Sequence, residues 1–488
     1  MADADHTPPL LTLPLELREI IYKEVLSNPL HSPHLLSVCK EIHSEARKFL
    51  YQRPLLFRGQ AAMYHWLDQA PKEHLHHVIE ITLELQDVDL KPLLDPVANF
   101  DSESSTPRLS AWELHESELD TLNQALGRLE NVKTLTLRAL PERQSFLYRE
   151  FLANVLESLG SRYPNLSSLT LDGNFHHQSL AFLSSLHKLE SFSFDGFSSS
   201  SPVKTATILS SLTHLTSLSI ISKHAVLTPT THQHSSFTSK RQSLTTPVLL
   251  AMKQLASLSL IETMHPTTGS PLFFTPEVLS SLRDHPTLDN LSIRLSDAPN
   301  AEILEAFEDF LENAPGIQRL ELDWPGLEPE TLETYTLLPE NAKDFWVRCE
   351  GMEAAFDILC SVMESREAGD LQALERVVLI KGIWGEPEAA SGAEEAGEGE
   401  VGQEEDGDED SESVAGEDDD VDDGAGKVAE THVSLDVSSL VFAFPSLRFF
   451  LRSCSPSTYG IIYFPLICKA YANALDYRMS PTPMIQTK

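Results

Sequence analysis

The chain has 488 residues, 41% of them hydrophobic, and a formal net charge of −37. That length and apolar content suffice for two or three ordinary domains, or for one elongated repeat domain with appendages. The negative charge argues against nucleic acid as a partner, because phosphate binding depends on clustered positive charge.

The cysteines and the apolar stretches indicate in which cellular compartment the protein is expected. Five scattered cysteines without a CxxC pair indicate neither a disulfide framework nor a zinc module. A reducing compartment, cytoplasmic and/or nuclear, fits this pattern best. The least polar stretch falls short of the roughly 20 residues that span a bilayer, so no membrane partner is expected.

Two short helices are predicted near the N-terminus, within residues 10–58. Pro14 suits the first turn of a helix, and Leu17, Ile20 and Ile21 follow at helical spacing. Ser32-Pro33 is typical of a second helix start. The apolar stripe expected on that second helix consists of Leu35, Val38, Ile42, Ala46 and Phe49.

Cys39 and His43 lie four residues apart on the second predicted helix, a spacing that suits two metal ligands. A zinc site requires three or four ligands, and the only other candidates nearby in sequence are His31 and His34. We therefore interpret Cys39 as a small core residue and His43 as a surface residue, and predict no metal.

A repeated pattern begins near residue 76: apolar, two residues, apolar, one residue, apolar. Clear copies have their central apolar residue at positions 135, 169, 192, 218, 258, 291 and 320, and weaker copies start at Val78 and Leu374. Helical segments lie between copies, several of them ending at a proline. Stacked strand-and-helix units predict an α/β solenoid over residues 76–385 with a parallel sheet on its concave side.

The acidic segment 386–430 interrupts this pattern. It contains 20 acidic residues and a single lysine, with almost no large apolar side chain. Its like charges repel one another, so disorder is predicted. The apolar residues that follow, 431–480, predict a last repeat and a C-terminal cap of the solenoid.

The residue between the last two apolar positions of each repeat points away from the core. In six of the seven clear copies it is a hydroxyl residue: Thr136, Thr170, Ser193, Ser219, Ser259 and Ser292. The neighbouring column mixes charges, such as Asp195, with Ile221 and Ile261. Such a floor suits a polypeptide client held by hydrogen bonds and a central apolar contact, although Ser and Thr also simply tolerate a tight parallel sheet.

Signatures of common enzymes are missing from the sequence. It contains no GxSxG, HExxH, Walker-type GxxxxGK or GxGxxG motif. We therefore predict no catalytic residues, no cofactor and no enzymatic activity.

Two resemblances follow from these motifs. The repeats resemble irregular leucine-rich repeats, although the asparagine usual after the strand is present only as Asn174. The N-terminal helices resemble the F-box, specifically the divergent F-box-like modules common in fungal proteins. The shared residues are Leu13, Pro14 and Glu16, then Ile20 and Ile21, then Val38, Cys39 and Lys40.

The F-box resemblance implies a partner. In that family the opening loop and helix dock on the adaptor of an SCF-type cullin-RING ubiquitin ligase, and a C-terminal repeat domain holds the substrate. The implied adaptor-binding residues are Leu13, Pro14, Leu17, Ile20, Ile21 and Val38. The hypothesis is thus a non-catalytic recognition subunit for an unknown protein client. The alternative is a ligase-independent scaffold whose N-terminal helices only cap the solenoid.

Overall fold

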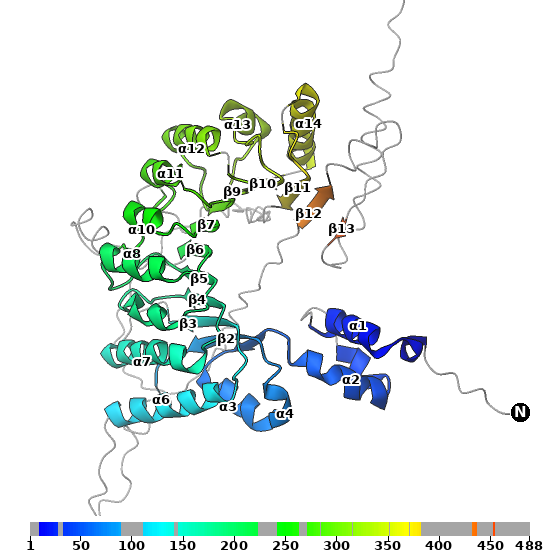
Figure 1. Ribbon diagram of the computed structural model, residues 1–488, viewed down its shortest axis with the longest axis vertical. Helices are drawn as coiled ribbons and strands as arrows, with labels where there is room; N and C mark the ends of the chain where they lie inside the picture. Colours follow the sequence, from blue (N-terminus) through cyan, green and yellow to red (C-terminus); the bar gives the residue numbers. More distant parts are fainter. Residues whose placement is uncertain are drawn as a thin grey trace, which may run out of the picture.

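The computed structural model describes residues 9–27, 33–88, 111–140, 145–222, 242–262, 271–283, 285–314, 316–350, 352–369, 371–381, 432–436 and 452–453. They form an α/β fold in two parts (Figure 1). Residues 9–27 and 33–50 make a small helical unit, called the N-terminal module below. From residue 55 onward, strands and helices alternate in a curved solenoid.

The N-terminal module contains η1 (Pro9–Thr12), α1 (Leu15–Ser27), η2 (Pro33–Ser37) and α2 (Lys40–Leu50). The prediction that the second helix starts at Pro33 is therefore wrong. Only a short 3-10 turn follows the proline. Cys39 then adopts an extended conformation, with φ −158° and ψ 164°, and α2 begins after it.

The strands form one 13-stranded sheet whose order follows the described chain. They are β1 (Leu55–Phe57), β2 (Glu80–Leu85), β3 (Thr134–Ala139), β4 (Ser168–Asp172), β5 (Ser191–Phe194), β6 (Ser217–Ser222), β7 (Ser257–Glu262), β8 (Asn290–Leu295), β9 (Arg319–Asp323), β10 (Asp344–Cys349), β11 (Arg376–Lys381), β12 (His432–Asp436) and β13 (Arg452–Ser453). Neighbours from β1 to β11 pair in parallel, whereas β12 and β13 are antiparallel.

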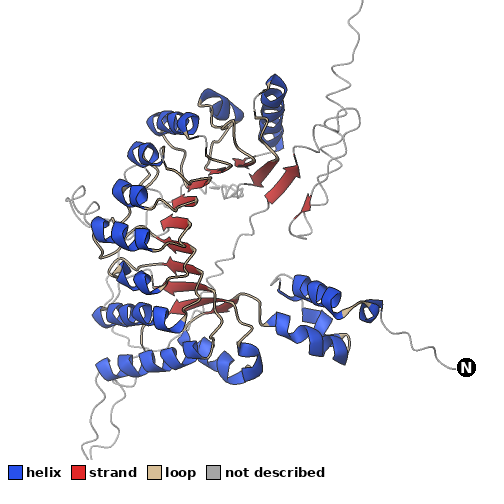
Figure 2. Ribbon diagram, viewed as in Figure 1, coloured by secondary structure: helices blue, strands red, loops and turns tan. Residues whose placement is uncertain are grey.

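The predicted apolar positions set the register of the sheet. The central residue of each clear copy pairs with the next, in the row Leu135, Leu169, Phe192, Leu218, Leu258, Leu291 and Leu320. All seven are 0% exposed. Since side chains alternate along a strand, one face of the sheet supplies the core and the other faces the inside of the curve (Figure 2).

The helices cover the outer side of the sheet (Figure 2). They are α3 (Gln60–Gln69), α4 (Lys72–Leu75), α6 (Ala111–Gly127), α7 (Phe146–Arg162), η3 (Leu180–Ser185), α8 (Pro202–Ser211), α10 (Thr246–Ala251), α11 (Pro276–Leu282), α12 (Ala301–Asn313), α13 (Pro329–Thr334) and α14 (Met352–Ala368). Ser145, Ser201, Thr275 and Asn300 cap α7, α8, α11 and α12 by accepting the N–H three residues later. Short hydroxyl and amide side chains thus mark the switch from strand to helix.

Acidic side chains accept backbone N–H groups at turns after the strands. Glu262 is 6% exposed and accepts the backbone N–H groups of Leu272, Phe273 and Phe274 at 2.6, 2.9 and 3.0 Å. Asp195 accepts the N–H of its near neighbour Phe197 at 3.0 Å. Carboxylates therefore satisfy backbone donors at these turns.

Three boundaries differ from the sequence prediction. The sheet begins at β1, before residue 76, because Leu55 and Leu56 pair with β2. β10 was not predicted, since its first apolar position is the small Ala342. Near the C-terminus β12 and β13 run antiparallel instead of forming a further parallel repeat. The acidic segment 386–430 and most of 431–480 lie outside the described residues.

Candidate functional site

The N-terminal module has a hydrophobic core of its own. Tyr22, Leu26, Ile42, Ala46 and Phe49 are buried together, and Leu10, Leu11, Leu35, Leu36 and Cys39 pack against them. Within the described chain this cluster is separate from the solenoid core, which extends from Phe57 to Leu379. The module is therefore held together by contacts between α1 and α2 rather than by burial against the repeats.

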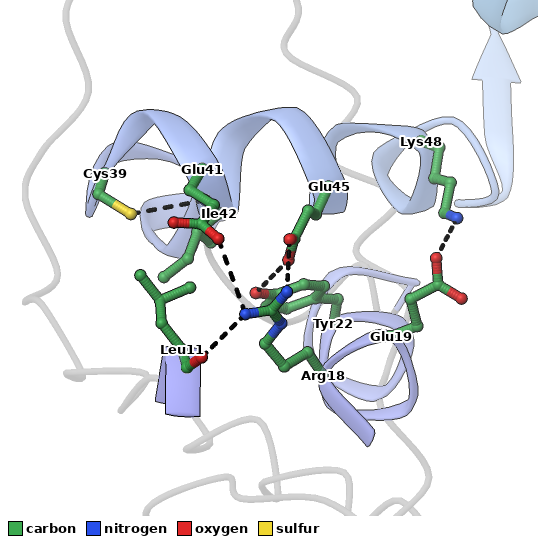
Figure 3. A network of polar contacts seen from close by, with 9 residues as sticks. All are labelled: Leu11, Arg18, Glu19, Tyr22, Cys39, Glu41, Ile42, Glu45 and Lys48. Atoms are coloured by element: carbon green, nitrogen blue, oxygen red, sulfur yellow. Dashed lines mark hydrogen bonds and ion pairs between the residues drawn. The ribbon is translucent and has the colours of Figure 1, made fainter. Parts of the chain in front are cut away.

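A polar network fixes α1 against α2 (Figure 3). The Arg18 side chain is 11% exposed and donates to the Leu11 carbonyl at 3.0 Å and to Glu45 Oε1 at 2.7 Å. The Tyr22 hydroxyl donates to Glu45 Oε2 at 3.1 Å. Burial, and then the nearby Glu45 carboxylate, raise the pKa of Tyr22 to about 12. The Glu45 carboxylate on α2 thus accepts hydrogen bonds from both polar side chains on the inner face of α1, Arg18 and Tyr22.

Cys39 and His43 are both engaged inside the module. Cys39 Sγ caps α2 by accepting the N–H of Ile42 at 3.5 Å (Figure 3). His43 Nδ1 lies 3.1 Å from the carbonyl oxygen of Leu36. Among the described residues no group of three or more His, Cys, Asp or Glu side chains is arranged to hold a metal ion. Cys39 is thus the N-cap of α2, and the side chain of His43 is exposed.

The outer surface of the module includes several exposed apolar side chains. Every residue predicted to bind the adaptor is exposed: Leu13 and Ile21 at 37%, Leu17 at 49%, Ile20 at 65%, Val38 at 58%, and also Pro14. Leu15, at the start of α1, is 43% exposed as well and was not predicted. The inner face of α1 consists instead of Arg18, Tyr22 and Leu26, four residues apart. The apolar stripe predicted on α1 is thus a solvent-facing surface.

The module meets the solenoid through polar and aromatic side chains. Arg47 on α2 forms an ion pair with Glu73 at 2.6 Å. The ring of Tyr51 stacks on His74, with ring centroids 4.9 Å apart. Burial, and then the positive charge of Arg47, lower the pKa of His74. This junction contrasts with the continuous apolar packing between successive repeats.

The predicted hydroxyl column is assembled on the inner face of the sheet. Strand pairing aligns Thr136, Thr170, Ser193, Ser219, Ser259 and Ser292 as direct neighbours. Ser193 is 6% exposed, and its Oγ has no hydrogen-bond partner among the described residues. Ile221 and Ile261 pair in the adjacent column and are partly exposed. The sheet therefore brings together the residues that the sequence singled out for client binding.

Asp195 does not belong to this inner surface. It is 8% exposed and contacts Nε2 of the buried His176, while its other oxygen accepts the N–H of Phe197. β5 ends at Phe194, one residue before it, so the chain has already turned into the loop. Strand periodicity alone could not place that turn. Asp195 supports the loop rather than a ligand.

The sequence analysis did not predict β10, and therefore did not predict the residues on its inner face. Trp346 and Arg348 alternate with the buried Phe345 and Val347, and both are partly exposed. The same apolar spacing, starting at Ala342, would have located them if alanine had been admitted at the first position.

The helices were examined for possible membrane spans, and the sequence was compared with known proteins. Of the helices in the described chain, none combines the length and apolar character of a bilayer span. No model of a known protein family matches the chain, and no curated protein sequence matches it.

Proposed function

We propose that this protein is a non-catalytic client-recognition subunit of an SCF-type cullin-RING ubiquitin ligase. In this proposal the N-terminal module is an F-box-like unit that binds the ligase adaptor. The solenoid, built of irregular leucine-rich repeats, binds a protein client. The protein would act by raising the local concentration of the client near the ubiquitin-charged enzyme.

The exposed apolar surface of α1 carries this proposal. Leu17 and Ile20 are about half or more exposed on a helix whose inner face is already packed. Leu13 and Val38, from the segments before α1 and α2, are exposed as well. A surface with this many exposed apolar side chains is typical of a protein-binding site. Its residues are those that the F-box resemblance assigns to the adaptor.

The inner face of the sheet supports the client-binding half. The hydroxyls of the aligned column can both donate and accept hydrogen bonds, as the backbone of an extended polypeptide requires. Ile221 and Ile261 offer an apolar contact beside them. The side chains of this column are small, and all except the buried Ser193 are partly exposed.

The alternative of a capping pair of helices receives less support. A terminal cap is expected to bury apolar side chains against the first repeat. The apolar side chains of α1 and α2 pack into a separate cluster, while β1 and α3 already contribute Phe57, Met63 and Leu67 to the solenoid core.

Affinity purification of the full chain followed by mass spectrometry tests the proposal. We expect the intact protein to recover the adaptor and its cullin, and the Leu13→Ala/Pro14→Ala/Ile20→Ala variant to lose both. A matched control is Val203→Ala/Leu250→Ala, which removes apolar side chains that are 77% and 51% exposed on the solenoid. This control should recover the adaptor normally. Failure of the intact protein to recover any adaptor would refute the ligase proposal and leave the scaffold alternative.

A further inference from the structure

The inner face of β8 to β11 differs from the hydroxyl floor in the middle of the sheet. One row across these strands contains Asn290, Arg319, Asp344 and Arg376, and the next contains Ser292, Glu321, Trp346 and Val378. Four of these eight side chains are charged: Arg319, Asp344, Arg376 and Glu321. The C-terminal end of the inner face therefore has its own chemistry.

Three ion pairs between described residues lie in this region, and Arg319 belongs to none of them. Arg294 pairs with Glu321 at 2.7 Å, Arg348 with Asp323 at 3.2 Å, and Arg376 with Asp344 at 2.8 Å. Each pair joins neighbouring strands. All three carboxylates on this part of the face have an arginine partner.

Arg319 is the arginine left over. It lies opposite Asp344 in the register, but Asp344 Oδ1 accepts from Arg376. Within the described part of the chain, Arg319 makes no ion pair and donates no hydrogen bond. Its guanidinium carbon lies 4.4 Å from the centroid of the Trp346 ring. Stacking on an aromatic ring holds the guanidinium in place and leaves its N–H donors for another acceptor.

We propose that Arg319, held on Trp346, is a subsite for an aspartate or glutamate side chain of an extended polypeptide client. A guanidinium binds a carboxylate through two parallel N–H···O bonds. The partly exposed indole of Trp346 then contacts the apolar part of the same segment. This inference rests on the proposed function, because it specifies the client that the repeats bind.

The charge count favours a carboxylate over a phosphorylated residue. A phosphoryl group carries a charge of about −1.5 to −2 and is usually bound by several arginines. Here one unpaired arginine lies among three carboxylates, Glu321, Asp323 and Asp344. A single negative charge neutralises Arg319, whereas a second one would be repelled by these carboxylates.

Selection of random peptides by the full-length protein tests the subsite. We expect enriched peptides to share an acidic residue at one position. The best peptide is then compared by fluorescence anisotropy with two derivatives, in which the acidic residue is replaced by its amide or by phosphoserine. Replacement by the amide should weaken binding about tenfold or more. The phosphoserine peptide should bind no better than the acidic one.

Variants of the protein assign the effect to Arg319. Arg319→Gln should weaken the acidic peptide about tenfold or more but leave the amide peptide unchanged, and Arg319→Lys should be intermediate. The control Arg128→Gln removes an arginine that contacts Asp68 at 3.5 Å outside this surface, and should have no effect. Unchanged melting temperatures would exclude misfolding as the cause.

Several results would overturn this inference: no enriched peptides, no acidic preference, tighter binding of the phosphoserine peptide, or equal affinities for wild type and Arg319→Gln. Adaptor recovery distinguishes this failure from failure of the proposed function. Arg319→Gln should recover the adaptor normally, because the N-terminal module is unchanged. Loss of peptide binding with intact adaptor recovery would therefore affect the subsite alone.

Discussion

Glu45 should decide the stability of the N-terminal module. It accepts hydrogen bonds from both Arg18 and Tyr22, and the side chains of Arg18 and Glu45 are only 11% and 19% exposed. Glu45→Gln keeps the size of the side chain and removes the charge. Arg18 then remains buried with the Leu11 carbonyl and with Glu41 at 3.8 Å.

The expected cost follows from this geometry. Removing one partner of a buried ion pair costs about 3–5 kcal/mol, and the residual exposure of these side chains places this pair near the lower end. A loss of about 3 kcal/mol raises the population of the locally unfolded module roughly 100-fold. A core of five buried side chains offers little reserve against such a loss.

Hydrogen exchange with mass spectrometry measures this effect on the full chain. Amides of α1 and α2 should exchange up to about 100-fold faster in Glu45→Gln, while those of β3 to β9 stay unchanged because the two cores are separate. The control Glu41→Gln, at a 58% exposed side chain, should change exchange by less than about threefold. Normal protection of α1 in Glu45→Gln, or loss of protection in the repeats, would refute the reasoning.

Four further predictions test the solenoid and its independence from the N-terminal module. Glu262→Ala leaves two buried and one partly buried backbone N–H groups without their acceptor and should cost about 3–5 kcal/mol in urea denaturation. A loss below about 1 kcal/mol would contradict the role of this carboxylate. Burial raises the pKa of Glu262, so its folded pKa exceeds the unfolded one. Relative to Glu262→Gln, wild-type stability should therefore be greatest below the unfolded pKa and decline as pH rises through the folded pKa, which urea midpoints between about pH 4 and pH 8 would detect. Leu169→Ala, at a residue 0% exposed, should cost about 2–5 kcal/mol, whereas the adjacent inner-face change Thr170→Ala should stay within about 0.5 kcal/mol; similar costs would contradict the assignment of the two faces. Deleting residues 1–52 should leave the melting temperature of the repeats within a few degrees, and loss of cooperative melting would indicate that the module is a structural cap.

Much of the solenoid could be predicted because its core is built from local repeats. Leu135 and Leu169 lie at equivalent positions of successive copies, and burial of each against the next fixes the register. β10 escaped prediction because Ala342 is a weak apolar signal, although its small side chain is 0% exposed. Pattern recognition thus failed where packing accepts a smaller residue than the repeat template suggests.

The N-terminal module shows what periodicity cannot decide. Leu17, Ile20 and Ile21 form an apolar stripe, but spacing alone does not say whether such a stripe faces a core or solvent. The structure buries Arg18 instead, because its charge is satisfied by Glu45, 27 residues further along the chain. The aliphatic stem of an arginine can line a core when its head group is paired. Such a long-range partner is invisible in the local pattern.

On the inner face of the sheet, one sequence prediction was confirmed and another was wrong. Its hydroxyl column was predicted and is aligned by strand pairing, from Thr136 to Ser292. The burial of Asp195 was not predicted, because it depends on the loop that brings His176 against it. Side chains within a strand follow the repeat, whereas those beyond the strand end depend on the individual turn.

Titration of the purified full chain with the purified SCF adaptor tests the central claim most directly. The exposed parts of Leu17 and Ile20, 49% and 65%, should each contribute about 1–2 kcal/mol when buried in a complex. Saturable binding is expected, with a Kd that Leu17→Ala/Ile20→Ala raises by roughly 100-fold. Absence of binding, or an equal Kd for both proteins, would contradict the assignment of this surface to the adaptor.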